Sequence, residues 1–255
     1  MHRRSIRTAT TAVIVAPVVL AAGPAIGAGP GRQAPMIASG SSTPFFITHG
    51  SAGDGATTST NWSGYAATGG TYTSVSVTFA QPAIKCSFGD QYASFWVGLD
   101  GDGSDSVEQT GTEADCDGGD PEYSSWYELY PADPVNYHNT INAGDEITET
   151  VAFSGTDTYT MTIKDATEGW TRTAKKHSSH HARASAEVIV EAPYNDGVLP
   201  LADFGTVKFT RGTIDGDPLA AAKVAKITMA SRSGRIKAQV GALSGGSFAE
   251  SWKSR

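Results

Sequence analysis

Two polar residues in separate strand-like runs have the clearest potential for chemistry in this sequence. Gln109 lies in the run 106–111, and Glu191 lies in the run 186–193, about 80 residues further along the chain. A side-chain amide donates hydrogen bonds to a developing oxyanion, and a carboxylate accepts a proton from water. If the fold brings these two side chains together, the pair can activate water and stabilise an oxyanion.

The strands that carry these residues assign them to faces, because side chains at positions i and i+2 of a strand point the same way. Gln109 shares a face with Val107, and Glu191 shares a face with Glu187. Two more runs combine aromatic and acidic residues on one face: Trp96, Gly98 and Asp100, and then Trp126, Glu128 and Tyr130. Solvent-facing surfaces usually lack Trp and cores usually lack Glu, so such faces indicate a binding groove on a sheet.

Simpler explanations exist for the polar residues. A single Glu in a strand is most often a solvated surface residue, and Trp and Tyr usually pack in the core or at an edge. No Ser or Cys lies in a G-x-S-x-G nucleophile motif. His177, His180 and His181 follow two lysines in a polar stretch, which favours an exposed hairpin loop over a metal site. The run 100–105 has no Glu at the twelfth position of a calcium loop and is interpreted as an acidic turn. No metal or cofactor is expected.

The patterned segments beyond residue 58 almost all alternate with period two, which is typical of β-strands. Turns rich in Gly, Asp, Asn and Ser separate them. The expected strands are 75–79, 92–99, 106–111, 123–130, 147–153, 159–163, 184–191, 205–210, 224–229, 235–240 and 248–252. Only 219–222 is suited to a helical turn. The pattern predicts one all-β domain over 58–255, folded as a two-sheet antiparallel β-sandwich.

The N-terminus has the pattern of a targeting segment. Arg3, Arg4 and Arg7 precede an apolar stretch over 11–23 that is short for a membrane span, and small residues follow it. Residues 1–28 are therefore predicted to be a signal peptide, removed by either the general or the twin-arginine export route. Residues 29–57, rich in Gly, Ser, Ala, Pro and Thr, are predicted to be a flexible linker or short pro-segment. The protein is expected to be secreted.

The charge balance is acidic. The whole chain has a net charge of −7, and loss of residues 1–28 removes three arginines and no acid, which gives −10. This balance argues against nucleic acid or an anionic membrane as a partner. It suits work in acid and, equally, simple solubility.

The two cysteines, Cys86 and Cys116, are expected to pair, because disulfides are the default in exported proteins.

Five blocks together resemble the glutamic peptidases, also called eqolisins. They occur in the order of that family: 61–64 (NWSG), 96–101 (WVGLDG), 109–111 (QTG), 126–131 (WYELYP) and 186–191 (AEVIVE). The resemblance covers about residues 58–210. The best-known fungal members carry extra cysteines, including a pair in a hairpin after the catalytic Glu. The corresponding stretch here, 193–201, is short and has no cysteine, so subsite preference is expected to differ more than chemistry.

The resemblance implies two packed sheets of the concanavalin A-like kind, with the site on the concave face. It implies a catalytic dyad of Gln109 and Glu191, whereas Glu187 matches a non-catalytic glutamate. Residues that line or support the site are then Trp96, Asp100, Trp126 and Glu128.

The implied function is an acid endopeptidase acting on polypeptides, with Glu191 as general base and Gln109 as oxyanion donor. A monomer is the default expectation. Two alternatives remain open: a glycoside hydrolase that uses Glu128 and Glu191 beside Trp96 and Trp126, and a carbohydrate-binding module without catalysis. Only the peptidase needs Gln109.

Overall fold

The computed structural model describes residues 46–49, 57–179 and 182–255 of the 255-residue chain. The predicted signal peptide 1–28 and most of the predicted linker 29–57 lie outside these residues. Within the predicted linker, Phe46–His49 form a short strand that pairs with the strand beginning at Thr57. The boundaries of the predicted segments therefore stay a prediction.

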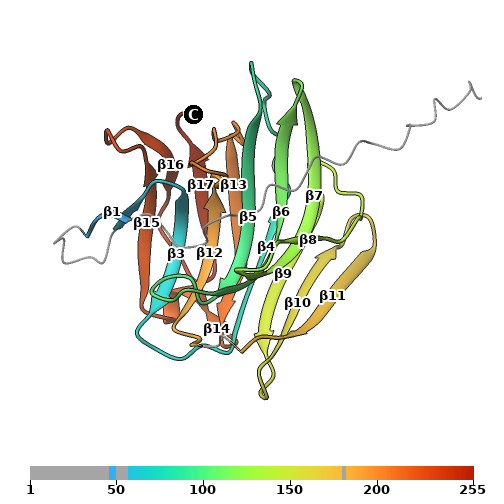
Figure 1. Ribbon diagram of the computed structural model, residues 1–255, viewed down its shortest axis with the longest axis vertical. Helices are drawn as coiled ribbons and strands as arrows, with labels where there is room; N and C mark the ends of the chain where they lie inside the picture. Colours follow the sequence, from blue (N-terminus) through green and yellow to red (C-terminus); the bar gives the residue numbers. More distant parts are fainter. Residues whose placement is uncertain (1–45, 50–56, 180–181) are drawn as a thin grey trace, which may run out of the picture. The chain divides into compact units, whose positions relative to one another are not determined.

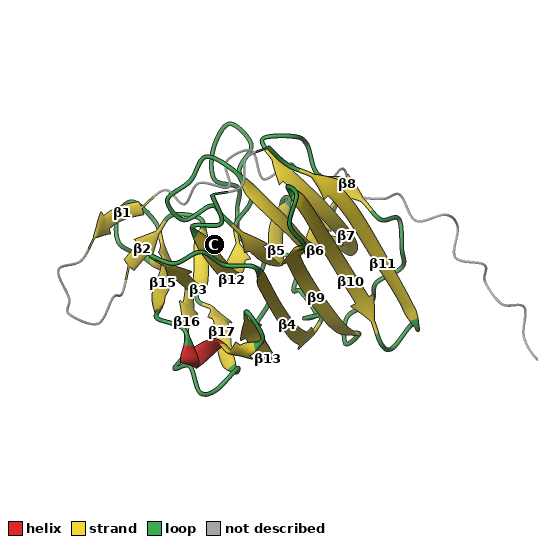
Figure 2. Cartoon of the chain, turned by 90° about the horizontal axis from the view of Figure 1, so that it is seen from below, coloured by secondary structure: helices red, strands yellow, loops and turns green. Residues whose placement is uncertain are grey.

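The described chain is built almost entirely of β-strands (Figures 1 and 2). The strands are β1 (Phe46–His49), β2 (Thr57–Ser59), β3 (Trp62–Thr68), β4 (Ser74–Ala80), β5 (Gln91–Leu99), β6 (Val107–Asp117), β7 (Asp120–Tyr130), β8 (Val135–Asn136), β9 (Glu146–Phe153), β10 (Thr158–Asp165), β11 (Trp170–His177), β12 (Ser185–Glu191), β13 (Thr206–Ile214), β14 (Asp217–Pro218), β15 (Val224–Ala230), β16 (Ile236–Val240) and β17 (Phe248–Trp252). A 3₁₀ helix, η1 (Leu219–Ala221), agrees with the predicted helical turn. Among the described residues, no helix has the length and apolarity to cross a membrane.

Pairing is antiparallel almost throughout, so the predicted all-β antiparallel class is confirmed. One run of neighbouring strands is β15–β3–β12–β5–β6–β7, with the short β8 beside β7. A second run is β11–β10–β9–β4–β13. The exception to the antiparallel rule is β2, which runs parallel to β15. Strands β16 and β17 continue the first run beyond β15. Strand β13 connects both runs, because 206–209 pair with β17 and 210–214 pair with β4.

The main apolar core collects side chains from both runs of strands. Phe95 of β5 lies 6.0 Å from Phe79 of β4 and 5.6 Å from Phe204, measured between ring centroids. Phe209 of β13 packs edge-on against Phe79 at 5.3 Å. Each such buried side chain contributes about 1.5–3 kcal/mol relative to exposure. The core thereby fixes the inner face of β5, β6 and β12 and leaves their opposite face for other uses.

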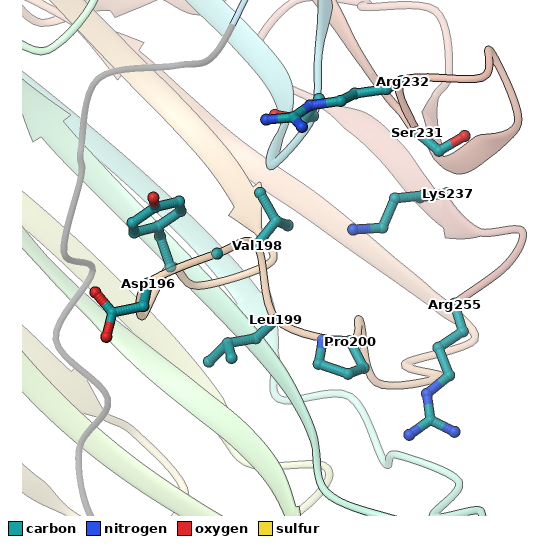
Figure 3. A pocket seen from close by; sticks show the side chains of 11 residues that line it. Asp196, Val198, Leu199, Pro200, Ser231, Arg232, Lys237 and Arg255 are labelled. Carbon is teal, nitrogen blue, oxygen red and sulfur yellow. The ribbon is translucent and has the colours of Figure 1, made fainter.

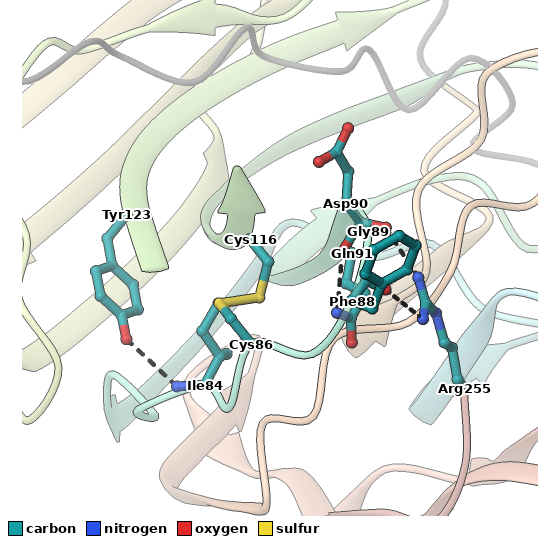
Figure 4. The surroundings of a disulfide bond; sticks show 9 residues. All are labelled: Ile84, Cys86, Phe88, Gly89, Asp90, Gln91, Cys116, Tyr123 and Arg255. Atoms are coloured by element: carbon teal, nitrogen blue, oxygen red, sulfur yellow. Dashed lines mark hydrogen bonds between the residues drawn. A yellow bond between two sulfur atoms is a disulfide. The ribbon is translucent and has the colours of Figure 1, made fainter. Parts of the chain in front are cut away.

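The predicted disulfide between Cys86 and Cys116 is present (Figure 4). It joins the segment before β5 to the end of β6, across a sequence separation of 30 residues. In the chain-entropy model a loop of this length adds about 3–4 kcal/mol to stability. The bond therefore anchors the far end of the strand that carries Gln109.

One strand contradicts the prediction. The segment before His177 was expected to be a hairpin loop, but Trp170–His177 form β11, which pairs with β10 along its whole length. In this strand Ala174 is the one buried residue. A strand that buries so little has no alternation of apolar and polar residues to reveal it.

Candidate active site

The register of β12, β5, β6 and β7 aligns the site residues in rows across one face of the sheet. Each row crosses the sheet from β12 through β5 and β6 to β7. The first row is Glu187, Gly98, Gln109 and Glu128; the second is Ile189, Trp96, Gly111 and Trp126; the third is Glu191, Ser94, Glu113 and Ser124. Strand β3 extends the third row with Trp62, opposite Glu191. The predicted sharing of faces along each strand is confirmed.

The middle row is formed by tryptophans that lie over glycine. A Cβ at Gly111 would meet the carbonyl oxygen of Phe95 and the Cβ of Trp96 at 2.5 Å each, so only glycine fits there. Trp96 packs edge-on against Trp62 with ring centroids 5.0 Å apart. These rings form a small apolar cluster on this face, separate from the main core. Of its three indole N–H groups, that of Trp96 donates to Glu191, and those of Trp62 and Trp126 have no hydrogen-bond partner within the described residues.

Gln109 is held by Glu128 on the adjacent strand. Its Nε2 donates a hydrogen bond to Oε2 of Glu128, and both side chains are buried. One amide N–H is thus used, and the second is left for another acceptor. The Oε1 of Gln109 has no hydrogen-bond partner within the described residues. Unpaired buried polar atoms are uncommon in native proteins and mark places that merit a functional explanation.

Glu191 is held by a different set of donors. Nε1 of Trp96 donates to its Oε2 at 3.0 Å, and Nδ2 of Asn61 donates to its Oε1 at 3.2 Å. Ser59 in turn donates to Oδ1 of Asn61 at 3.0 Å, which orients that amide. Burial nevertheless raises the pKa of Glu191 to about 8, because removal from water outweighs these donors.

The structure brings Gln109 and Glu191 onto one face without a direct hydrogen bond between them. They stand on β6 and β12, with β5 between, and the Trp96 row separates their rows. Four residues along a strand correspond to roughly 13 Å. A substrate group would therefore have to lie between the two side chains, above Trp96.

Asp100 lies at the end of β5 and has a supporting position. Its two carboxylate oxygens accept hydrogen bonds from the backbone N–H groups of Arg183 and Ala184, at 2.7 and 2.8 Å. The backbone of Asp100 has a φ of 69°, which turns the chain out of the strand. Asp100 thus fixes the start of β12, the strand that ends at Glu191, and within the described residues it does not hydrogen-bond to Gln109 or Glu191.

The remaining carboxyl groups on this face also titrate abnormally. Burial raises the pKa of Glu128, Glu187 and Glu113 above the ordinary range. For Glu128, the nearby Glu191 raises the pKa further, and the hydrogen bond from Gln109 lowers it. No cation of the described residues forms an ion pair with any of these groups. In acid these carboxyl groups are therefore neutral, which removes most of the cost of burying them.

Two contributors were missed as site residues by the sequence analysis. Asn61 belongs to a recognised block and also fits the glycosylation sequon Asn-Trp-Ser, but its side chain is fully buried against Glu191. Glu113 aligns with Glu191 across Ser94, whose Oγ donates to Glu113 at 3.1 Å. Glu113 lies four residues after Gln109 on the same strand, so the sequence could have placed both side chains on one face.

Of the three histidines considered as a metal site, only His177 lies within the described residues. His177 ends β11, where its Nδ1 lies 3.2 Å from Oγ1 of Thr158. His180 and His181 lie outside the described residues.

A comparison with models of protein families supplies the deciding observation, since the model of the Peptidase A4 family matches residues 60–249, well over half of the chain. The chain belongs to the Peptidase A4 family. This confirms the resemblance to the glutamic peptidases.

Two curated members of the Peptidase A4 family show the degree of similarity. Aspergillopepsin-2 from Aspergillus niger is 30% identical over 177 residues, which cover 60% of this chain and 63% of that protein. Scytalidopepsin B from Scytalidium lignicola is 32% identical over 143 residues, which cover 53% of each chain. The aligned part thus spans less than two thirds of either relative.

Solved structures of Peptidase A4 relatives have the same fold. Scytalido-glutamic peptidase, solved with a transition-state analogue inhibitor, superposes with a TM-score of 0.68 at 26% identity and covers 76% of this chain and 98% of that one. Aspergilloglutamic peptidase from Aspergillus niger gives a TM-score of 0.58 at 28% identity and covers 64% of this chain and 99% of that one.

Proposed function

We propose that this protein is a secreted acid endopeptidase that hydrolyses peptide bonds with a dyad of Gln109 and Glu191. The observation that carries the proposal is the separate anchoring of the two groups. Glu128 holds one N–H of the Gln109 amide, whereas Trp96 and Asn61 hold the two oxygens of Glu191. Each group thus keeps a fixed orientation and retains hydrogen-bonding capacity for a substrate.

The proposed reaction needs no covalent intermediate. The Glu191 carboxylate takes a proton from water, and the oxygen of that water attacks the scissile carbonyl carbon. The second N–H of Gln109 donates to the resulting oxyanion, a contribution worth about 2.7–4 kcal/mol for comparable donors. Glu191 then gives its proton to the leaving nitrogen, and the C–N bond breaks to release an amine and a carboxylic acid.

The ionisation of Glu191 sets a condition on this reaction. A general base has to be ionised at the working pH, but burial raises the pKa of Glu191 to about 8. Both dyad side chains are buried here, so substrate binding has to expose them and admit water. Hydration lowers the pKa of a carboxyl group, and the donors from Asn61 and Trp96 stabilise the ionised form. We propose that the base forms in this opened state.

The proposal extends to the architecture and location of the protein. The two runs of strands are proposed to form the two-sheet, concanavalin A-like sandwich, with the dyad on its concave face. Residues 1–28 are proposed to direct export, and the mature protein is proposed to act as a monomer on polypeptides, without nucleic acid or membrane partners.

Digestion of a denatured protein between pH 3 and 7 tests this function, with the Gln109→Ala and Glu191→Ala variants beside the wild type. We expect wild-type cleavage in acid and a loss of about 10²-fold or more in kcat/KM for each variant, with circular dichroism unchanged. Full activity in a folded Glu191→Ala variant would refute the assignment. A β-glucan panel in the same experiment would detect a glycosidase that uses Glu128 and Glu191, and saturable glycan binding without turnover would indicate a binding module.

A further inference from the structure

A cavity of about 660 Å³ lies beside the candidate active site, at the end of β12 that carries Glu191 (Figure 3). One wall is the segment that follows Glu191, and Tyr194 and Val198 pair there in a small hairpin. Another wall is the turn between β15 and β16, which contributes Arg232. Thr60, next to the Asn61 that holds Glu191, also lines the cavity. A peptide whose scissile bond lies at Glu191 would therefore extend past this cavity.

The cavity is cationic in a protein that is acidic overall. Its lining includes three basic residues, Arg232, Lys237 and Arg255, and one acidic residue, Asp196. In Figure 3, Asp196 lies across the cavity from Lys237 with its carboxylate directed away from it. The whole chain has a net charge of −7, so this local excess of positive charge runs against the general balance.

Lys237 is the most informative of these residues. It is 93% buried on β16, yet Figure 3 shows its ammonium group directed into the cavity. Within the described residues no carboxylate pairs with it and no hydrogen bond from its side chain is formed. Burial and the neighbouring Arg235 lower the pKa of Lys237 to about 8. In acid the group is still charged, so a buried cation without an anion faces the cavity.

The two arginines have different positions around the cavity. Arg255 is already engaged, because its guanidinium donates to the carbonyl oxygens of Phe88 at 2.8 Å and Asp90 at 3.4 Å (Figure 4). Arg255 therefore contributes positive charge and part of the wall to the cavity, and its guanidinium is already hydrogen-bonded. Arg232 is exposed at the rim and forms no ion pair with the described residues. Buried charges are normally paired or hydrogen-bonded, so the buried Lys237 leaves one charge to be supplied by a ligand, and the exposed Arg232 adds positive charge at the rim.

We propose that this cavity binds a carboxylate of the polypeptide substrate, on Lys237 with Arg232 at the rim, and so makes the enzyme selective for peptides with an anionic group next to the cleavage site. The carboxylate belongs either to an Asp or Glu side chain or to the C-terminus of the peptide. The inference rests on the proposed peptidase function and adds its selectivity. The stretch 193–201, which has no cysteine pair, forms one wall of the cavity.

Matched peptides test this selectivity in the full-length protein. The peptides differ by Glu against Gln at each position around one cleavage site, and each is made with a free and with an amidated C-terminus. At pH 5, where a Glu side chain is mostly ionised, we expect an acidic peptide to exceed its neutral partner about tenfold in kcat/KM at one position. The free and amidated pairs decide between the side chain and the C-terminus. At pH 3 the preference should fall strongly, because a Glu side chain is then almost fully protonated and a C-terminal carboxyl group mostly so.

Lys237→Met retains the length of the side chain and removes its charge. We expect the ratio of kcat/KM between acidic and neutral peptides to fall to about twofold or less in this variant, and Arg232→Gln, a surface change that should not affect folding, to reduce it partly. Lys164→Met, an exposed lysine on β10, is the control for loss of one charge and should keep the wild-type ratio. A ratio that Lys237→Met and Arg232→Gln both leave unchanged, or no acidic preference in the wild type, overturns the inference.

The binding of the same peptides to Glu191→Gln, measured by calorimetry, separates this inference from the proposed function. Cleavage of neutral peptides without acidic preference would overturn the selectivity and leave the peptidase intact. If no polypeptide is cleaved, the proposed peptidase function is wrong. Tighter binding of acidic peptides that depends on Lys237 would then still support the cavity, and equal binding would overturn it.

Discussion

Strands β5, β6 and β12 bury both of their faces. One face is mainly apolar, although Glu108 of β6 is buried on it, and the other face carries several carboxyl groups. On one face Phe95, Val97 and Val188 join the main apolar core. On the other face Gln109, Glu187 and Glu191 are equally buried among tryptophans. The first face gains stability from its contacts, whereas the second accepts the desolvation of several carboxyl groups.

The burial of carboxyl groups on the second face, which carries Gln109, Glu187 and Glu191, indicates a functional role for that face. Buried carboxyl groups without cations weaken a fold at neutral pH and are tolerated where they serve a function or where the medium neutralises them. Lys237, which forms no ion pair within the described residues, lies outside the rows and faces the neighbouring cavity. Positive and negative groups are thus kept apart, so that each remains available to a substrate.

The largest expected effect separates two glutamates on the carboxyl-rich face. Glu191→Gln should lower kcat/KM by about 10²–10⁴, because it removes the proposed base with little change of shape. Glu187 lies four residues earlier on β12 and is equally buried. Glu187→Gln should lower kcat/KM by less than about tenfold. Steady-state kinetics with one peptide measures both variants.

Equal losses in the two variants would contradict a special role for Glu191 and would mean that the face works as a collective electrostatic unit. A greater loss for Glu187→Gln would reverse the assignment. Thermal unfolding of both variants is the control, because a partly unfolded variant loses activity for another reason.

The face of each residue followed from the sequence, whereas its environment did not. Period-two alternation placed Trp96, Gln109 and Glu191 correctly, because the pleat leaves no freedom in this respect. Burial was the difficult part, since the same alternation fits a solvated face. The donors to Glu191 also depend on which strands become neighbours: Asn61 comes from the start of β3, 130 residues away in sequence. Such long-range register is not encoded in any local pattern.

The next effect concerns stability against pH. The folded pKa of Glu191 is raised from 4.5 to about 8, so between these values the folded state binds more protons than the unfolded state. The free energy of unfolding therefore falls as pH rises through this window, and other buried carboxyl groups add to the trend. We expect the Tm to be at least about 5 °C higher at pH 4.5 than at pH 8, measured by calorimetry.

A matched pair of variants tests whether the fall in Tm between pH 4.5 and pH 8 comes from the carboxyl-rich face. Glu113→Gln removes one buried carboxyl group and should reduce the difference in Tm between the two pH values. Asp120→Asn, at an exposed position on β7, should leave the wild-type slope. A Tm that rises from pH 4.5 to 8 would show that the carboxyl-rich face does not control stability.

The smallest expected effect concerns Glu128, which touches Gln109 and is proposed to position it. In Glu128→Gln the carboxyl group that accepts from the Gln109 amide is replaced by a second amide, so the Gln109 amide is held less firmly and samples more orientations. We expect kcat to fall about tenfold or less with KM changed by less than about twofold, because an uncharged hydrogen bond contributes about 0.5–1.5 kcal/mol. Combining the change with Gln109→Ala distinguishes positioning from direct catalysis. If Glu128 acts only through Gln109, Glu128→Gln should have no further effect on kcat in the Gln109→Ala background. Additive losses would instead make Glu128 an independent participant, as the glycosidase alternative requires, and would link the two carboxyl groups of this face as a working pair.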